Sequence, residues 1–545
     1  MPRSWKEIAA KKRAALLESI PEEWCIPADI LPPESQLDVT TFPQKSGWFT
    51  AEELEITNSS ATVLLKRLRS GKYSSEQVTK AFCKRASAAH QLTNCLSETL
   101  FDLALRTART LDEHLATTGQ PIGPLHGLPI SIKDNFQVRG TDATLGFSSL
   151  VGKPSPFNST LVDLLLAAGA IVYVKTNVPT AMMIAETVNN VFGRTLNPRN
   201  RKLTSGGSSG GESALIAFGG SCLGVGSDIG GSLRIPAACT GLWTLRPSAG
   251  RFPTTKTRSG LAGQEAVMSV NGPLAPDLAT IATYSQKVVE LSPWLDDPKC
   301  LPIPWRKVDV PKKLKIGVLW DDDVVLPTPP IRRALQLAVN KLRRAGHEII
   351  EWKSEGMHER AARLIARMFV SDGGKSVRAL LAPTREPFRP EMRSYEDAEE
   401  LGVYNMWQIH LERNDLQSKY LDRWNAAGLD AILCPTAPYA AVEHDKFRYV
   451  GYTCVYNCLD YSAVSFPTGL RVDQQVDGFS AEDQIRETRN EFDKLTKDEC
   501  KSPSLFPDNV EAIDGQPINL QLVARRLEEE KVLAMAEKVS DALKA

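Results

Sequence analysis

Ser205-Gly-Gly-Ser-Ser-Gly-Gly-Glu212 and Gly226-Ser-Asp-Ile-Gly-Gly-Ser-Leu-Arg234 are two glycine and serine clusters, and thirteen residues separate them. Glycine permits positive φ angles and close approach of the backbone, but it weakens regular elements. Serine hydroxyls beside exposed backbone N–H groups provide a nucleophile and a site for a developing anion, which acyl transfer requires. The two clusters therefore indicate a backbone shaped for chemistry.

Three other interpretations of the clusters are disfavoured. A flexible linker does not fit, because residues 214–218 and 222–225 between the clusters are apolar core material. A phosphate-binding P-loop requires Lys and then Ser or Thr after its last glycine, where this chain has Glu212. Gly207-Ser-Ser-Gly-Gly211 matches the G-x-S-x-G nucleophile elbow, which requires a strand directly before it. Residues 197–202 predict no strand, so we interpret this match as coincidental.

Patterns outside the clusters predict alternating helices and strands, which favours one large α/β domain. Ser74-Ser-Glu-Gln77 is a capping box that begins a helix. The alternating residues Leu128, Ile130 and Ile132 predict a strand that delivers Lys133 at its end. Other predicted helices cover residues 97–115, 159–168, 212–218, 331–344 and 529–543, and other strands 170–174, 316–319, 348–352, 431–433 and 518–523. The charged residues from about 471 to 513 predict an excursion over the surface.

A serine nucleophile requires a base, and the spacing of the residues leaves two candidates. Consecutive small residues before Ser232 can turn several backbone N–H groups toward one point beside its hydroxyl. His126 and Lys133 are the titratable residues near these motifs. Structural capping explains His126 as well as catalysis does, and a solvated surface charge is the ordinary role of a lysine at a strand end. The residues alone therefore leave the base open.

The order of the motifs resembles that of the amidase signature family. Besides the two clusters, the resemblance rests on Leu128-Pro-Ile-Ser-Ile-Lys-Asp134, Lys175-Thr-Asn-Val-Pro179 and Asn197-Pro198, and it is densest from about residue 124 to 250. The segments Pro2-Arg-Ser-Trp5, Gln91-Leu-Thr-Asn94, Glu186-Thr-Val-Asn-Asn190 and His444-Asp-Lys-Phe-Arg448 resemble the fungal acetamidase branch. The resemblance implies one α/β domain over residues 71–545, with a mixed β-sheet covered by helices on both faces. A helical and irregular extension, residues 1–70, would pack on this core.

The resemblance also implies a Ser-Ser-Lys triad. Ser232 would be the nucleophile, Ser208 the bridging serine after a cis peptide bond, and Lys133 the base. Neutral, desolvated Lys133 would take the proton of Ser208 while Ser208 takes that of Ser232. The other implied site residues are the oxyanion-binding N–H groups of Ile229, Gly230, Gly231 and Ser232, substrate contacts at Met182 and Ser208, and supports at Ser209, Asp228 and Arg234.

Composition excludes several classes of partner. Lys plus Arg and Asp plus Glu both number 65, so no bulk charge attracts nucleic acid or an anionic membrane. The longest apolar stretch, residues 164–174, is shorter than the ~20 residues that a membrane span requires, and the N-terminus lacks a signal-peptide core. Ten scattered cysteines are typical of free thiols, and the pair Cys454 and Cys458 lacks a second Cys/His pair for zinc. We therefore expect a cytoplasmic protein without metal or other cofactor.

These observations predict an amidase that cleaves small, acetamide-like carboxylic amides to acid and ammonia through an acyl-Ser232 intermediate. Three alternatives stay open: an amidase for a larger or specialised-metabolite amide, an amidotransferase-type subunit that works with a partner, and a catalytically idle scaffold. A membrane-bound fatty-amide hydrolase is disfavoured because no N-terminal span is found. The expected partner is a small-molecule amide, and the sequence leaves a homodimer open.

Overall fold

The computed structural model describes residues 4–478, 480–499 and 512–545, which fold around an eleven-stranded mixed sheet. The strand order is β1-β3-β2-β8-β10-β9-β14-β15-β13-β11-β12. These strands are β1 (Leu96–Thr99), β2 (Pro129–Lys133), β3 (Ile171–Thr176), β8 (Gly224–Asp228), β9 (Trp243–Arg246), β10 (Val270–Ala275), β11 (Lys315–Val318), β12 (Glu348–Glu351), β13 (Ala431–Pro435), β14 (Ala463–Arg471) and β15 (Pro517–Val523). Two further pairs, β4 (Val188–Asn189) with β5 (Gly193–Arg194) and β6 (Leu196–Asn197) with β7 (Asn200–Thr204), form separate two-stranded sheets. The predicted α/β class is confirmed.

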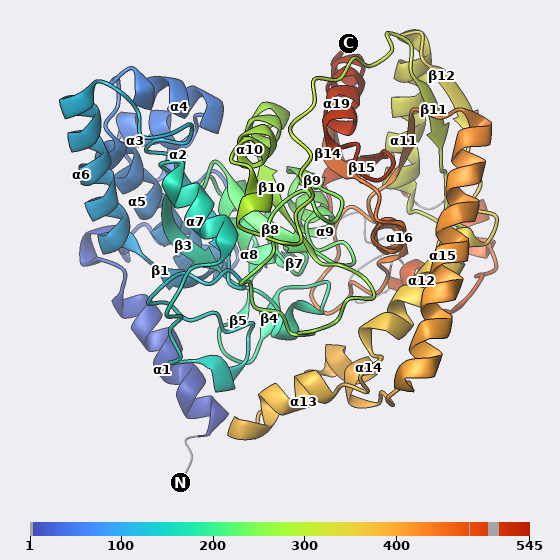
Figure 1. The fold of residues 1–545 in the computed structure, drawn as a ribbon, viewed down its shortest axis with the longest axis horizontal. Helices are drawn as coiled ribbons and strands as arrows, with labels where there is room; N and C mark the ends of the chain where they lie inside the picture. Colours follow the sequence, from blue (N-terminus) through green and yellow to red (C-terminus); the bar gives the residue numbers. More distant parts are fainter. Residues whose placement is uncertain (1–3, 479, 500–511) are drawn as a thin grey trace.

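Helices cover both faces of the sheet (Figure 1). They are α1 (Trp5–Glu18), α2 (Phe42–Lys45), α3 (Ala51–Thr57), α4 (Ala61–Arg69), α5 (Ser75–Thr93), α6 (Phe101–Thr118), α7 (Thr160–Ala167), α8 (Gly210–Ala217), α9 (Arg234–Thr240), α10 (Leu278–Glu290), α11 (Pro329–Arg344), α12 (Met357–Phe369), α13 (Lys375–Leu381), α14 (Arg393–Glu396), α15 (Gly402–Ala427), α16 (Gly451–Leu459), α17 (Ala481–Ile485), α18 (Glu491–Glu499) and α19 (Glu529–Lys544). Figure 1 shows α2 to α6 gathered at one end of the molecule and α11, α12 and α15 at the other. Within the described residues, no helix combines the length and apolar composition that crossing a bilayer requires.

Parallel pairing occurs in two regions of the sheet. Strand β2 lies between β3 and β8 and runs parallel to both, and β11 lies between β12 and β13 in the same way. Strands β2, β3 and β8 are buried along their whole length, as strands inside a covered sheet are. The predicted β-α-β unit is confirmed as β11, α11 and β12.

The prediction of one helix over residues 97–115 is wrong at its start. Residues Leu96–Thr99 form the edge strand β1, which pairs antiparallel with β3, and α6 begins only at Phe101. The pairing of Leu96 with Thr176 joins residues far apart in sequence, so local periodicity could not show it. The capping box of Ser74 and Gln77 is present at the start of α5, as predicted.

The predicted excursion over residues 471–513 lies partly outside the described residues, because 479 and 500–511 are not among them. Its described part contains α17 and α18 and is joined to α11 by ion pairs. Arg332 contacts Asp483 at 2.6 Å, and Arg333 contacts Asp477 at 2.6 Å. These salt bridges fix the charged segment to α11, and Val472 and Ile513 add apolar contacts in a cluster with Ile331 and Ala334 of the same helix.

The N-terminal helix α1 is attached to the sheet through a buried charge cluster. Lys12 Nζ lies 2.6 Å from Glu98 of β1 and 3.0 Å from Asp142. Further along, Trp24 and Phe42 belong to the same apolar core as the strands β2 and β3. The segment from Ile20 to Leu68 thus contributes side chains to the same core as the sheet.

Candidate active site

Parallel strands β2 and β8 bring the two distant motifs to one edge of the sheet. Lys133 is the last residue of β2, and Asp228 is the last residue of its neighbour β8. Because the carboxyl ends of adjacent parallel strands meet at the same edge, Lys133 lies beside the second glycine cluster. The first cluster leads into α8, which packs against both strands. The fold therefore gathers all three motifs around one point.

Lys133 contacts the first cluster directly. Its Nζ lies 2.7 Å from Ser208 Oγ and 2.9 Å from Ser227 Oγ, and the Lys133 and Ser208 side chains are buried. The Gly207–Ser208 peptide bond is cis, as the resemblance implies. Of the two candidate bases, Lys133 is thus the one that reaches a serine of the clusters. His126 instead accepts a hydrogen bond from the Ile122 N–H at 3.1 Å.

Burial changes the protonation of Lys133. Complete desolvation lowers the pKa of Lys133 from 10.5 to about 7, although the charges of Asp228, Glu212 and Asp134 act in the opposite direction. Loss of water disfavours the ammonium ion more than the neutral amine. A substantial fraction of the Lys133 amine is therefore neutral near pH 7 and able to accept a proton.

Ser232 lies in the loop between β8 and α9 and is partly exposed. The Ser209 N–H donates to the Ser232 carbonyl at 3.2 Å, which joins the two clusters. Within the described residues, Ser232 Oγ makes no hydrogen bond, and none links the hydroxyls of Ser208 and Ser232. The Ser232 hydroxyl is thus open to an incoming molecule.

The loop before Ser232 exposes backbone donors. Among the described residues, the N–H groups of Ile229, Gly230 and Ser232 donate no hydrogen bond. The Gly231 N–H differs, because it donates to Asp228 Oδ1 at 2.9 Å. Gly231 has a φ of 135°, and a Cβ there would lie 2.2 Å from Thr453 Oγ1. Three of the four predicted N–H groups are therefore free, and the fourth holds the loop.

A buried network fixes this loop from behind. Asp228 accepts hydrogen bonds from the Leu233 N–H at 3.2 Å and from Arg234 Nε at 3.1 Å. Although burial acts to raise it, the Arg234 charge lowers the pKa of Asp228 to about 2. Asn457 of α16 donates to Asp228 at 2.7 Å and accepts from Arg234 at 2.7 Å. The carboxylate and guanidinium thus hold the loop as a paired, fully hydrogen-bonded unit.

Sequence reasoning missed three polar residues that touch the site. Ser227 contacts Lys133 Nζ, Thr453 Oγ1 donates to the Gly230 carbonyl at 2.7 Å, and Asn457 holds Asp228. Thr453 and Asn457 stand four residues apart in α16, which is otherwise mostly apolar. Residues at that spacing share one face of a helix, so this pair was a usable signal. Ser227 lies inside the second cluster, but only the pairing of β2 with β8 shows its contact.

Met182 belongs to an apolar cluster that approaches the loop. It packs with Leu145, Phe147 and Phe369, and it has a φ of 61°. Phe369, at the end of α12, would lie 3.3 Å from a Cβ on Gly230. The apolar cluster therefore reaches the backbone donors beside Ser232.

The prediction that no strand precedes the G-x-S-x-G match at 207–211 is wrong. The serine of that match, Ser209, is nevertheless not an exposed nucleophile. Strand β7 (Asn200–Thr204) does directly precede the first cluster, in a two-stranded sheet with β6. A local hairpin of polar residues has too little apolar alternation to be recognised from sequence. The Ser209 side chain is fully buried, and its Oγ donates to the Ser227 carbonyl at 3.4 Å.

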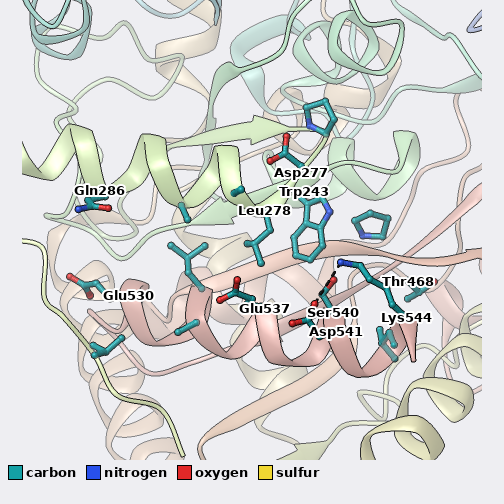
Figure 2. A pocket seen from close by; sticks show the side chains of 18 of the residues that line it. Trp243, Asp277, Leu278, Gln286, Thr468, Glu530, Glu537, Ser540, Asp541 and Lys544 are labelled. Atoms are coloured by element: carbon teal, nitrogen blue, oxygen red, sulfur yellow. Dashed lines mark ion pairs between the residues drawn. The ribbon is translucent and has the colours of Figure 1, made fainter. Parts of the chain in front are cut away.

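A cavity of about 790 Å³ lies elsewhere, between α10 and α19 (Figure 2). Trp243 and Leu278 face Glu537 and Lys544 across it. Neither Lys133 nor the site serines line it, so it is separate from the candidate active site.

The described cysteines are free thiols, and Cys454 and Cys458 are buried in α16. Cys500 lies outside the described residues. In the described part of the chain, no group of three or more His, Cys, Asp or Glu side chains is arranged to hold a metal ion.

Comparisons with known proteins extend over nearly the whole chain. A family model described as Amidase matches residues 77–533. An acetamidase of Emericella nidulans is 40% identical over 562 aligned residues, covering 100% of this chain and 99% of that protein. An acetamidase of Aspergillus oryzae is also 40% identical, over 99% of each chain. A solved fatty acid amide hydrolase structure is similar with a TM-score of 0.94 at 34% identity, covering 99% of this chain and 95% of that one.

Proposed function

Because this chain belongs to the amidase signature family and is an amide-hydrolysing enzyme, we propose that it cleaves small carboxylic amides through an acyl-Ser232 intermediate. The observation that carries the proposal is the 2.7 Å contact between Lys133 Nζ and Ser208 Oγ beside the open hydroxyl of Ser232. A neutral amine, a bridging hydroxyl and an unpaired hydroxyl form the sequence of groups that a proton relay requires.

The proposed reaction begins with two coupled proton transfers. Neutral Lys133 takes the proton of Ser208, Ser208 takes the proton of Ser232, and Ser232 Oγ attacks the amide carbonyl carbon. The free N–H groups of Ile229, Gly230 and Ser232 receive the charge that develops on the carbonyl oxygen. The N–H of Gly231 supports this loop through Asp228 and can join the other donors when the oxyanion forms.

The second half of the proposed reaction reverses the relay. The lysine proton passes through Ser208 to the nitrogen of the leaving group, the C–N bond breaks, and ammonia or an amine departs. Water then loses a proton to the same relay and attacks the acyl-Ser232 ester. Release of the acid restores the Ser232 hydroxyl and neutral Lys133.

Small, acetamide-like amides are the proposed substrates. Two acetamidases at 40% identity over the full length support this choice. The 0.94 TM-score to a fatty acid amide hydrolase favours a second candidate, an amide with a long acyl chain. Phe369 beside Gly230, with Met182 in the same apolar cluster, suits an apolar acyl group in either case. A larger specialised amide and a partner-dependent amidotransferase subunit remain as alternatives, whereas the amidase relationship argues against an idle scaffold.

The proposal extends to the domain and its setting. Residues 71–545 form the amidase domain and residues 1–70 an extension packed on it, which the shared core containing Trp24 and Phe42 supports. Free thiols at the described cysteines support a reducing, cytoplasmic environment.

Hydrolysis of an amide panel by Ser232→Ala tests the function. The purified wild-type chain should hydrolyse acetamide, a long-chain fatty amide and an aryl amide at different rates, and Ser232→Ala should hydrolyse none of them. Ser70→Ala, which changes an exposed serine at the end of α4, is the matched control and should keep wild-type rates. Full activity of Ser232→Ala would contradict the proposal. Inactivity of the isolated wild-type chain on every amide would favour the partner-dependent or idle alternative.

A further inference from the structure

Glu212 carries a buried carboxyl group without a cation. It is the third residue of α8, and its side chain is fully buried. Its Oε2 lies 2.6 Å from Ser131 Oγ and its Oε1 lies 2.9 Å from Thr176 Oγ1. No ion pair to Glu212 is present among the described residues. An ionised carboxylate in such a place would bear most of the cost of leaving water.

Three contacts around Ser131 and Ser221 share only the two protons of these serine hydroxyls. Ser221 Oγ donates to the Leu223 carbonyl at 2.9 Å, and that carbonyl has no proton to give. Ser131 Oγ lies 2.9 Å from Ser221 Oγ and is placed as the donor in this contact. Its only proton is then used, and the 2.6 Å contact with Glu212 still requires one. A protonated Glu212 would supply that proton and make all three contacts hydrogen bonds.

We propose that Glu212 is held as a neutral carboxylic acid, and that its neutrality keeps Lys133 in the proton-accepting form. The inference rests on the proposed function of Lys133 as the base. Glu212 acts through Lys133 and touches neither substrate nor nucleophile, so it is a positioning residue. Burial raises the pKa of Glu212 from 4.5 to about 8, although the hydrogen bonds from Ser131 and Thr176 act to lower it. A carboxyl with this pKa is mostly protonated at pH 7, in agreement with the proton count.

The sheet brings the partners of Glu212 next to Lys133. Ser131 and Lys133 stand two residues apart on β2 and therefore point to the same face. Thr176 is the register partner of Lys133 on β3. A negative charge on Glu212 acts to raise the pKa of Lys133. A neutral acid leaves that pKa low.

Gly224 provides the space for this carboxyl. A Cβ at Gly224 would lie 2.1 Å from Glu212 Oε2 and 2.9 Å from Ser131 Oγ. The absence of a side chain on β8 thus admits the acid into contact with β2.

Four other titratable groups lie around this pair. Cys95 and Tyr173 face Glu212, and burial raises the pKa of Cys95 to about 12 and that of Tyr173 well above its ordinary value. Asp228 and Asp134 face Lys133. Asp228 is paired with Arg234, and Asp134 accepts hydrogen bonds from Ser97 and from the Leu145 N–H.

Glu212→Gln distinguishes a neutral from an ionised Glu212. Its amide can donate to Ser131 and accept from Thr176, so it reproduces both contacts of the acid. The readout is the pH at which kcat/KM falls to half of its maximum on the acid side of the profile, here called the acid limb. The maximum itself is free to differ between the two proteins. We expect this acid limb to coincide with that of the wild type. An acid limb displaced to lower pH by about one to three units would show that an anion had been removed, and would overturn the proposal.

Infrared spectroscopy tests the same proton without any activity. The difference spectrum between wild type and Glu212→Gln at neutral pH should contain the carbonyl band of a protonated carboxylic acid. If the variant does not fold, wild-type protein labelled with ¹³C at its glutamate carboxyls should still show that band. Its absence contradicts the proposal. Failure of the proposed function would look different, as an inactive wild-type chain or a fully active Lys133→Ala variant.

Discussion

Lys133 Nζ lies 2.7 Å from Ser208 Oγ, although 75 residues separate the two in sequence. Strand β2 supplies the lysine and the loop before α8 supplies the serine, and neither side chain is in contact with bulk water. The contact therefore couples a buried, readily neutralised amine to the hydroxyl nearest it. The proposed chemistry depends on this relationship, and the predictions below address its parts.

Removing the base should alter the pH dependence of the reaction. Because burial lowers the pKa of Lys133 to about 7, wild-type kcat/KM should fall as the pH drops below that value. Lys133→Ala should lose about 10²–10⁴-fold in kcat/KM at pH 7 and less at high pH, where hydroxide replaces the base. Steady-state rates from pH 5 to pH 10 measure both effects. An equal loss across this range, in a folded protein, would assign Lys133 a structural role.

The same lysine should lower the stability of the fold. Its pKa is lowered on folding, so between about pH 7 and 10.5 the unfolded chain binds more protons and stability rises with pH. Below pH 7 the full penalty of about 5 kcal/mol is present. Lys133→Met should therefore be more stable at pH 7 by about 3 kcal/mol, after about 1 kcal/mol is lost for each hydroxyl contact removed.

Urea unfolding of both proteins at pH 7 and at pH 10 checks this prediction. The advantage of Lys133→Met should shrink at pH 10, because the wild-type penalty disappears as the unfolded lysine loses its proton. A variant that is less stable than wild type at pH 7 would contradict the low pKa.

Breaking the network behind the loop should destabilise the protein. Arg234→Met leaves the carboxylate of Asp228 buried without its cation, which should cost about 3–5 kcal/mol of unfolding free energy. The carboxylate also holds the N–H groups of Gly231 and Leu233, so kcat should fall as well. Thermal unfolding and kcat, measured on Arg234→Met and on the exposed control Arg393→Met, test the two effects together. Unchanged stability would show that the pair is dispensable.

Shortening Met182 should change the choice of acyl chain. Phe369 lies beside Gly230 of the loop and Met182 packs against the same apolar cluster, so Met182→Ala should enlarge the apolar space on this side of the site. The ratio of kcat/KM for butyramide to that for acetamide should rise by roughly tenfold. The two substrates measured with wild type and variant give this ratio directly. An unchanged ratio would place Met182 away from the acyl group.

The residue patterns allowed the class of fold to be predicted, and the family resemblance implied that the three motifs meet. Apolar runs marked β2 and β3, because burial on both faces leaves a strong local pattern. The β11-α11-β12 unit was marked by its alternation of strand and helix patterns. Strand β1 could not be recognised, since its four residues become a strand only by pairing with β3.

The supports of the site were harder to predict than its serines and lysine. Thr453 and Asn457 contact residues 223 and 229 positions away; their spacing marks a polar helix face, but it does not show that this face contacts the second cluster. The protonation of Glu212 is inferred from three hydrogen bonds and the protons that they share. These bonds are known only once the fold places Ser131, Ser221 and Leu223 together.

Covalent labelling of Ser232 tests the central claim most directly. Wild-type enzyme is treated with a fluorophosphonate, digested, and mapped by mass spectrometry, with Ser232→Ala and Lys133→Ala in parallel. The account predicts one adduct per chain, located on Ser232, absent from Ser232→Ala and formed more slowly in Lys133→Ala. An adduct on Ser208 or Ser209, or no adduct on an enzyme that still hydrolyses amides, would contradict it.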